Sequence, residues 1–266
     1  MIALIILAII ILIYLFFVFP SVRKHKDLRV LKGSYIAHRG LHNKEKSVPE
    51  NSLLAFAEAA ANGYAIENDI RLTADGKVVV FHDDSLSRMC SQEGLVIEKT
   101  LDELKSLRLL DTDEQIPTLK ECLDLVDGRV PLLIEFKCGF EDYEKLCVAA
   151  NEVLRGYNGK YFIQSFNPLV LSWYRKNRKD ILRGQLAQKY NKKGFVAWLV
   201  SGFFMNFVAR PDFVAYNFAD SKAFCFKLQK LLGAFPVAWT FHTQQQIDKK
   251  KQEIKAYIFE CFIPKK

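Results

Sequence analysis

The segment Ala65-Ile66-Glu67-Asn68-Asp69-Ile70 places two carboxylates inside a short apolar stretch. Side chains of a β-strand point alternately to its two faces, so this segment as a strand puts Glu67 and Asp69 on the same face. Residues 52–62 before it have a helical pattern that ends at Gly63, a residue typical of helix C-termini. A helix that leads directly into a buried strand is the repeating unit of an α/β fold.

The same alternation of short apolar runs and helical patterns continues along the chain. Eight strands are predicted, at residues 35–38, 65–70, 132–136, 161–164, 183–187, 213–216, 237–240 and 257–259. Eight β-α repeats predict a (β/α)₈ TIM barrel over residues 34–266. An open doubly wound sheet is the alternative, but no glycine-rich phosphate loop follows the first strand.

The regular repeat is interrupted after the second predicted strand. Residues 78–81 follow the turn Asp75-Gly76 and predict a short hairpin strand. Residues 83–130 then form an insertion that contains two helical patterns, at 100–107 and 118–126. Outside the insertion, a further helical pattern at residues 243–254 precedes the last predicted strand.

The N-terminus is strongly apolar. Residues 1–19 contain no charge, and as a helix they would reach about 28 Å, near the thickness of a bilayer core. We therefore predict a transmembrane anchor at residues 1–20 rather than a cleaved signal peptide. The linker at 21–33 contains Arg23, Lys24, Lys26 and Arg29, which predicts a single-pass protein of the cell membrane with its catalytic domain in the cytoplasm.

A second apolar run covers residues 194–209 and follows a basic stretch. Residues 170–193 contain eight basic residues and one acid. The run is either a core helix or a segment that enters a lipid interface. Because the positive charge is concentrated in local patches, we expect an anionic membrane surface rather than nucleic acid as a partner. The oligomeric state stays open.

Composition describes a folded chain: of 266 residues, 50% are hydrophobic and 26% charged. Six cysteines occur without a C-x-x-C pair, so neither a disulfide scaffold nor a thiolate zinc site is indicated. A reducing compartment is the simplest interpretation.

Polar residues gather where the first predicted strands end. His38 ends the first strand, His82 follows the hairpin strand, and Glu135 and Lys137 share a face of the third strand. Catalytic residues of barrel enzymes lie at these ends, so three carboxylates should converge there. Mg²⁺ or Ca²⁺ would neutralise them, and the alternative is a salt-bridge network with nearby cations. Two histidines beside a cation suggest acid/base chemistry.

Several motifs resemble the glycerophosphodiester phosphodiesterase family. They are Ile36-Ala37-His38-Arg39-Gly40, Pro49-Glu50-Asn51-Ser52, Ile66-Glu67-Asn68-Asp69-Ile70, Leu72-Thr73-Ala74-Asp75-Gly76, Val79-Val80-Phe81-His82-Asp83, Ile116-Pro117-Thr118-Leu119, Ile134-Glu135-Phe136-Lys137, Ser165-Phe166 and Trp239-Thr240. The chain departs from the family near its end, where Phe259-Glu260-Cys261 replaces a Thr-Asp pattern, and at Phe241-His242. We expect these departures on the substrate side of the pocket.

The resemblance implies metal-dependent hydrolysis of glycerophosphodiesters to glycerol 3-phosphate and an alcohol, within phospholipid metabolism. It implies Glu67, Asp69 and Glu135 as metal ligands and His38 and His82 as the acid/base pair. The phosphate and substrate would contact Arg39, Lys137 and Trp239, with Glu50 in a supporting position. Two alternatives are phospholipase-D-like hydrolysis of a lysophospholipid or phospholipid headgroup, and a catalytically silent lipid-binding barrel.

Overall fold

The computed structural model describes residues 1–21, 25–43, 45, 47–189 and 194–265. Within them, eight parallel strands form a closed barrel. The strands are β1 (Tyr35–Ala37), β2 (Ala65–Leu72), β4 (Leu132–Phe136), β5 (Tyr161–Ser165), β6 (Arg183–Ala187), β7 (Phe213–Asn217), β8 (Phe235–Phe241) and β9 (Ala256–Phe259). The barrel closes because β1 pairs in parallel with both β2 and β9. The predicted TIM barrel is confirmed, and the open sheet is excluded.

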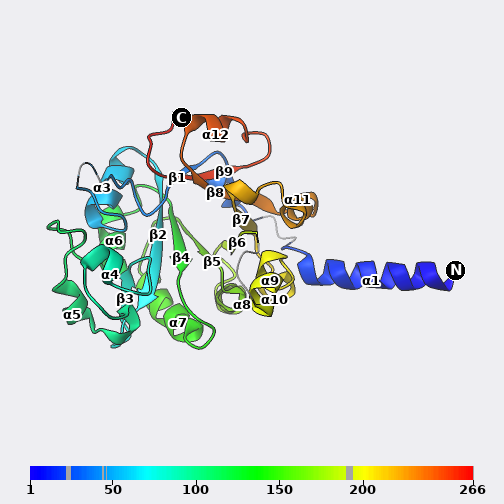
Figure 1. Cartoon of the computed structure of the whole chain (residues 1–266), viewed down its shortest axis with the longest axis horizontal. Helices are drawn as coiled ribbons and strands as arrows, with labels where there is room; N and C mark the ends of the chain where they lie inside the picture. Colours follow the sequence, from blue (N-terminus) through cyan, green and yellow to red (C-terminus); the bar gives the residue numbers. More distant parts are fainter. Residues whose placement is uncertain (22–24, 44, 46, 190–193, 266) are drawn as a thin grey trace.

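Helices surround the strands (Figure 1). Those around the barrel are α3 (Leu53–Ala61), α6 (Leu119–Val126), α7 (Tyr143–Leu154), α8 (Pro168–Asn177), α9 (Phe195–Ser201), α10 (Asn206–Ala209), α11 (Phe224–Leu231) and α12 (Gln244–Asp248). Helix α12 is much shorter than the predicted 243–254. Only Ile247 of α12 is buried, and three lysines follow it, so no apolar stripe holds further turns against the barrel.

The insertion after β2 follows the predicted hairpin strand. Strand β3 (Val78–Val80) pairs antiparallel with β2. It is followed by α4 (Ser87–Cys90), the 3₁₀ helix Val96–Glu98 and α5 (Leu101–Lys105), which cover their own small apolar cluster. Helix α6 contacts both α3 and α7, so it is the regular crossover helix of the barrel, and the insertion ends before it.

The barrel interior is layered. Its apolar cluster includes Ile36, Ala65, Leu133 and Ile258, which come from the four neighbouring strands β1, β2, β4 and β9. Helix α2 (Leu28–Leu31) places Leu31 against this layer. Two residues further along each strand the same face carries a polar side chain, because inward positions recur with period two. The polar layer therefore lies at the C-terminal ends of the strands.

The N-terminal helix α1 (Ile2–Val18) extends away from the barrel and contacts it only near its C-terminal end, beside α10 (Figure 1). In the described part of the chain, no helix combines the length and apolarity that crossing a bilayer requires. The predicted transmembrane anchor at 1–20 is therefore not supported. Helix α1 has 17 residues, which corresponds to a helix length of about 26 Å.

The apolar run at 194–209 forms two helices, α9 and α10, rather than one. Phe203, between them, is buried in the core, whereas Phe195 and Trp198 are largely exposed. Phe204 and Phe207 contact aromatic rings of α1. The run therefore combines a core residue with an exposed apolar surface. Lys192, Lys193, Arg23 and Lys24, which the charge argument used, lie outside the described residues.

Candidate active site

Three carboxylates lie together in the polar layer of the barrel. Strands β2 and β4 are parallel neighbours, and Asp69 is directly opposite Glu135 in their register. One carboxylate oxygen from each of Glu67, Asp69 and Glu135 lies within 4.8 Å of the other two. All three side chains are buried. The predicted convergence of Glu67, Asp69 and Glu135 is thus present.

Two cations flank the carboxylates. Lys137 Nζ is 2.6 Å from Glu135 Oε1 and 3.3 Å from Asp69 Oδ1. Arg39 Nε is 3.5 Å from Asp69 Oδ2, and its NH1 donates to Glu50 Oε1 at 2.7 Å. Although burial raises the pKa of Asp69, Lys137 and other nearby positive groups hold it below its usual range. Burial and the charge of Asp69 raise the pKa of Glu67 to about 8.

The donor set fits a hard divalent cation. Asp69 Oδ1 and Glu135 Oε1 are buried and, although both face Lys137, accept no aligned hydrogen bond from the described residues. Arg39 and Lys137 bring two positive charges to three carboxylates, so these two monovalent cations do not fully neutralise the cluster. Convergent carboxylate oxygens are the ligands that Mg²⁺ and Ca²⁺ prefer. Lys137 pairs with Asp69 and Glu135, but within the described residues Glu67 accepts only from the backbone N–H of Arg39 and the amide of Gln164, so a salt-bridge network alone does not explain the third carboxylate.

Each of the two expected catalytic histidines is held by a carboxylate. His38 Nδ1 is 2.5 Å from Glu260 Oε2, and His82 Nδ1 is 2.6 Å from Asp83 Oδ1. A carboxylate can only accept at neutral pH, so Nδ1 carries the proton and Nε2 is the atom that can exchange one. Both rings are available for acid/base chemistry through Nε2.

The environments of the two histidines differ. Burial lowers the pKa of His38, but the hydrogen bond that His38 donates to Glu260 and the charge of Glu67 outweigh it and raise that pKa. Burial dominates at His82 and lowers its pKa, although Asp69 acts in the opposite direction. Pairs of titratable groups with separated pKa values are typical of acid/base sites.

A polar chain connects Arg39 to His82 around the rim of the site. Glu50 accepts from Arg39 and from Arg88, whose NH2 lies 2.7 Å from Glu50 Oε1. Arg88 Nε donates to Asp83 Oδ2 at 2.6 Å, and Asp83 holds His82. Glu50 is thereby a positioning residue for Arg39.

The turn after β1 depends on Gly40. Its φ of +82° is a left-handed conformation, and a Cβ there would lie 2.8 Å from the Ala55 Cβ. The turn directs the backbone N–H of Arg39 to Glu67 Oε2 at 3.1 Å. Asn51 then fixes Asp69, with Nδ2 donating to Asp69 Oδ2 at 2.9 Å. The two motifs therefore build one support for the carboxylates.

Trp239 lies on the inward face of β8, two residues after the buried Val237. Its ring meets Phe166 edge-on with centroids 5.9 Å apart, and its Nε1 donates to the carbonyl of Ala215. Phe166 follows β5, so two strands contribute an aromatic wall at this end of the barrel. Such a wall suits the carbon skeleton of a small substrate.

Sequence reasoning missed the carboxylates that hold the histidines. Glu260 follows Ile258 by two positions, so strand alternation places it on the inward face, but nothing local indicates a partner 222 residues away. The departure at Glu260, which we expect on the substrate side of the pocket, also contacts His38. His42 and His242, which the sequence did not single out, also lie within 4.0 Å of Glu260.

Comparison with known proteins agrees with this geometry. The profile of the "Glycerophosphoryl diester phosphodiesterase family" matches residues 38–256. A glycerophosphodiester phosphodiesterase from Caldanaerobacter subterraneus is 36% identical over 170 residues, which cover 59% of this chain and 68% of that protein. Glycerophosphodiester phosphodiesterase 1 from Mus musculus is 38% identical over 41% of this chain, and that alignment spans only 36% of the mouse protein.

Solved structures share the fold. A phosphodiesterase from Oleispira antarctica, in complex with the product sn-glycerol-3-phosphate, superposes with a TM-score of 0.71 at 24% identity over 86% of this chain and 93% of that one. A glycerophosphodiester phosphodiesterase from Thermotoga maritima superposes with a TM-score of 0.67 at 25% identity, over 85% and 93% of the two chains. Taken with the profile match, which extends over more than half of the sequence, these likenesses show that the chain belongs to the glycerophosphoryl diester phosphodiesterase family.

Proposed function

We infer that this chain hydrolyses glycerophosphodiesters to glycerol 3-phosphate and an alcohol, within phospholipid metabolism. The observation that carries the inference is the combination of three buried carboxylates with two histidines whose Nδ1 atoms are each held by an acid. This is a complete set of groups for splitting a phosphodiester. A catalytically silent barrel would have no use for it.

Each residue of the site has its own role in the proposed reaction. Arg39 and Lys137 bind the anionic phosphate, and Glu50 orients Arg39. Glu67, Asp69 and Glu135 would hold a divalent cation, which would supply further charge neutralisation for the phosphoryl oxygens. One histidine accepts the proton of the attacking oxygen, from water or the neighbouring glycerol hydroxyl, and the other donates a proton to the departing alkoxide through Nε2. Mg²⁺ and Ca²⁺ both suit the oxygen ligands.

A lysophospholipid is the second candidate substrate. Phe140 and Ile263 are exposed on the loops that follow β4 and β9, and Phe224 is exposed at the start of α11, which follows β7, so all three lie at the same end of the barrel as the carboxylates. These side chains could contact an acyl chain. They lie on three separate segments, however, whereas Trp239 and Phe166 contact each other and form one aromatic wall, which favours a soluble diester.

The test is a comparison of two substrates with the full chain. Hydrolysis of glycerophosphocholine is followed by glycerol 3-phosphate formation, and hydrolysis of lysophosphatidylcholine by choline release. We expect kcat/KM to be at least about tenfold higher for glycerophosphocholine, which corresponds to about 1.4 kcal/mol of transition-state discrimination. Preference for the lysolipid would reverse the substrate assignment. Turnover of neither would refute the proposed activity.

We also propose that the chain is membrane-associated, with its catalytic domain on the cytoplasmic side. Two features support this proposal: Lys26, Arg29 and Lys32 follow the apolar helix, and all six cysteines are free thiols. Cys261 is exposed, so it suits a labelling test. A membrane-impermeant thiol reagent should label it in permeabilised cells and not in intact ones, and equal labelling of intact cells would reverse the orientation.

A further inference from the structure

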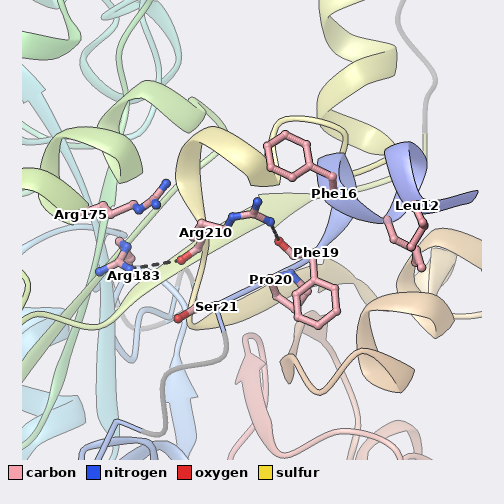
Figure 2. A pocket seen from close by; sticks show the side chains of 9 residues that line it. Leu12, Phe16, Phe19, Pro20, Ser21, Arg175, Arg183 and Arg210 are labelled. Carbon is pink, nitrogen blue, oxygen red and sulfur yellow. Dashed lines mark hydrogen bonds between the residues drawn. The ribbon is translucent and has the colours of Figure 1, made fainter. Parts of the chain in front are cut away.

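A cavity of about 660 Å³ lies between the end of α1 and the barrel. Figure 2 shows that its two sides differ in chemistry. One side is apolar and the other carries three arginines; the lining residues are Leu12, Leu15, Phe16, Phe19, Pro20, Ser21, Arg175, Arg183 and Arg210. A hollow with one apolar and one cationic side fits an anionic amphiphile.

Two of the arginines have no anionic partner within the described residues. Arg175 NH1 donates to the carbonyls of Phe207 and Val208, and Arg210 NH1 donates to the carbonyl of Phe19 at 2.7 Å. Arg183 differs, because its NH1 is 3.5 Å from the carboxylate of Asp212. Arg175 and Arg210 thus present positive charge, balanced only by backbone carbonyls, to the cavity.

The basic surface continues beyond this cavity. A second hollow of about 440 Å³ is lined by Ser172, Arg175, Lys176 and Lys179. It shares Arg175 with the first, so the two hollows form one cationic zone at the C-terminal end of α8. A zone of this kind attracts phosphate groups, and guanidinium forks bind phosphate oxygens in pairs.

The apolar side of the cavity continues into exposed hydrocarbon surface. Leu12 is 65% exposed and Phe16 is 57% exposed, and the outer turns of α1 expose every large apolar side chain. Phe195 and Trp198 of α9 are exposed near the same helix, where Trp198 stacks on Phe204 and Phe204 contacts Tyr14. Apolar surface of this extent is unfavourable in water and marks a lipid or protein contact.

We propose that this cavity binds the phosphate of an anionic phospholipid in a membrane surface. Arg175 and Arg210 ligate the phosphate, and the acyl chains lie along Leu12 and Phe16 of α1. The distribution of charge favours lipid over protein as the partner. An anionic phospholipid bilayer places phosphate at its surface and hydrocarbon below it, and the arginines and the apolar helix beside them have the same order.

The site is separate from the catalytic centre. Arg183 is the first residue of β6, and Arg210 precedes β7, so the cavity lies toward the N-terminal ends of the strands. The carboxylates lie toward the C-terminal ends. Lipid bound in the cavity therefore holds the chain at the surface without occupying the active site. The inference goes beyond the proposed hydrolysis and does not depend on it.

The test is vesicle flotation of the full-length chain. Vesicles consist of phosphatidylcholine alone or of phosphatidylcholine mixed with phosphatidylglycerol. We expect Arg175→Gln/Arg210→Gln to weaken binding to the anionic vesicles by about 30-fold, because each arginine at such a surface contributes about a fivefold effect. Arg175→Gln alone changes an exposed side chain, and we expect about fivefold weaker binding if the double variant does not fold.

A matched control removes the same charge elsewhere. Arg108→Gln/Lys222→Gln alters two exposed residues that do not line the cavity. It should bind anionic vesicles almost as the unchanged chain does, and both double variants should hydrolyse glycerophosphocholine at the normal rate. The proposal is overturned if the two double variants lose binding equally, or if the arginine variants bind normally. Displacement from vesicles by free glycerol 3-phosphate would also overturn it, because the cavity would then take soluble phosphate.

Discussion

Glu260 is the residue whose role the structure defines most sharply, through its hydrogen bond to His38 Nδ1. That bond and the buried carboxylate raise the pKa of His38, and the same contact lowers the pKa of Glu260 to about 2 against the effect of burial. Glu260 is therefore ionised throughout the working range. It fixes the tautomer of His38 and favours the protonated ring.

We predict that Glu260→Gln lowers kcat by about 10²-fold, because His38 loses both its orientation and part of its basicity. Removing the negative charge lowers the pKa of His38, so the limb of the pH–rate profile that belongs to His38 should move to lower pH. Glu260→Asp should restore part of the rate. Glu253→Gln, which affects two ion pairs away from the site, with Lys230 and Lys250, is the control. A normal kcat with an unchanged pH–rate profile would show that Glu260 does not act on His38.

The sequence predicted those site residues that alternate within one strand. Glu67 and Asp69, or Glu135 and Lys137, follow from period two and from the position of the strand ends. The partner of His38 could not be predicted, because the His38–Glu260 contact joins the first and last strands of the closed barrel. Only closure of the barrel brings such residues together.

At the scale of elements, the end of α1 is fixed to the barrel by two buried amides. Asn206 Nδ2 and Gln229 Nε2 each donate to the carbonyl of Val18 at 2.9 Å, and Asn206 also donates to Gln229 Oε1. All three residues are buried. Polar groups buried in this way are costly to leave without partners.

We predict that Asn206→Ala reduces the free energy of unfolding by about 2 kcal/mol, since it leaves the Gln229 oxygen without its partner. The measurement is the shift of the denaturation midpoint. Asn177→Ala changes an exposed amide that bonds only within its own helix, and it should shift stability by less than about 0.5 kcal/mol. Equal shifts for the two variants would mean that Asn206 does not hold α1 in place.

Strands were easier to predict than helices. The eight predicted barrel strands agree with the observed ones to within two residues at each end, since most of them are short, buried and largely apolar. The prediction at 243–254 was wrong because charge on one side does not create a helix when few apolar residues face the core. The run at 194–209 divided into two helices at Gly202, with Phe203 in a left-handed conformation.

At the scale of the whole molecule, the barrel separates two chemistries. Its strands carry carboxylates and histidines toward their C-terminal ends, while the apolar helix and the arginines that line the cavity lie toward the other end. Residues 1–19 were correctly predicted as a helix, but their uniform apolarity alone did not determine how that helix relates to a membrane. How α1 lies relative to a membrane depends on its contacts with α10 and on the basic zone beside it. These contacts join residues far apart in the chain and cannot be read from the sequence.

The measurement that tests the central claim is glycerol 3-phosphate formation from glycerophosphocholine, with and without a chelator, in the unchanged chain and in three variants. The variants are Glu67→Gln, Asp69→Asn and Glu135→Gln. We predict that EDTA abolishes turnover and that Mg²⁺ or Ca²⁺ restores it. Each variant should require a higher cation concentration, because an amide is a poorer ligand for a hard cation. Turnover that is indifferent to EDTA, with the same cation requirement in all three variants, would show that the carboxylates form a structural salt-bridge network and not a metal site.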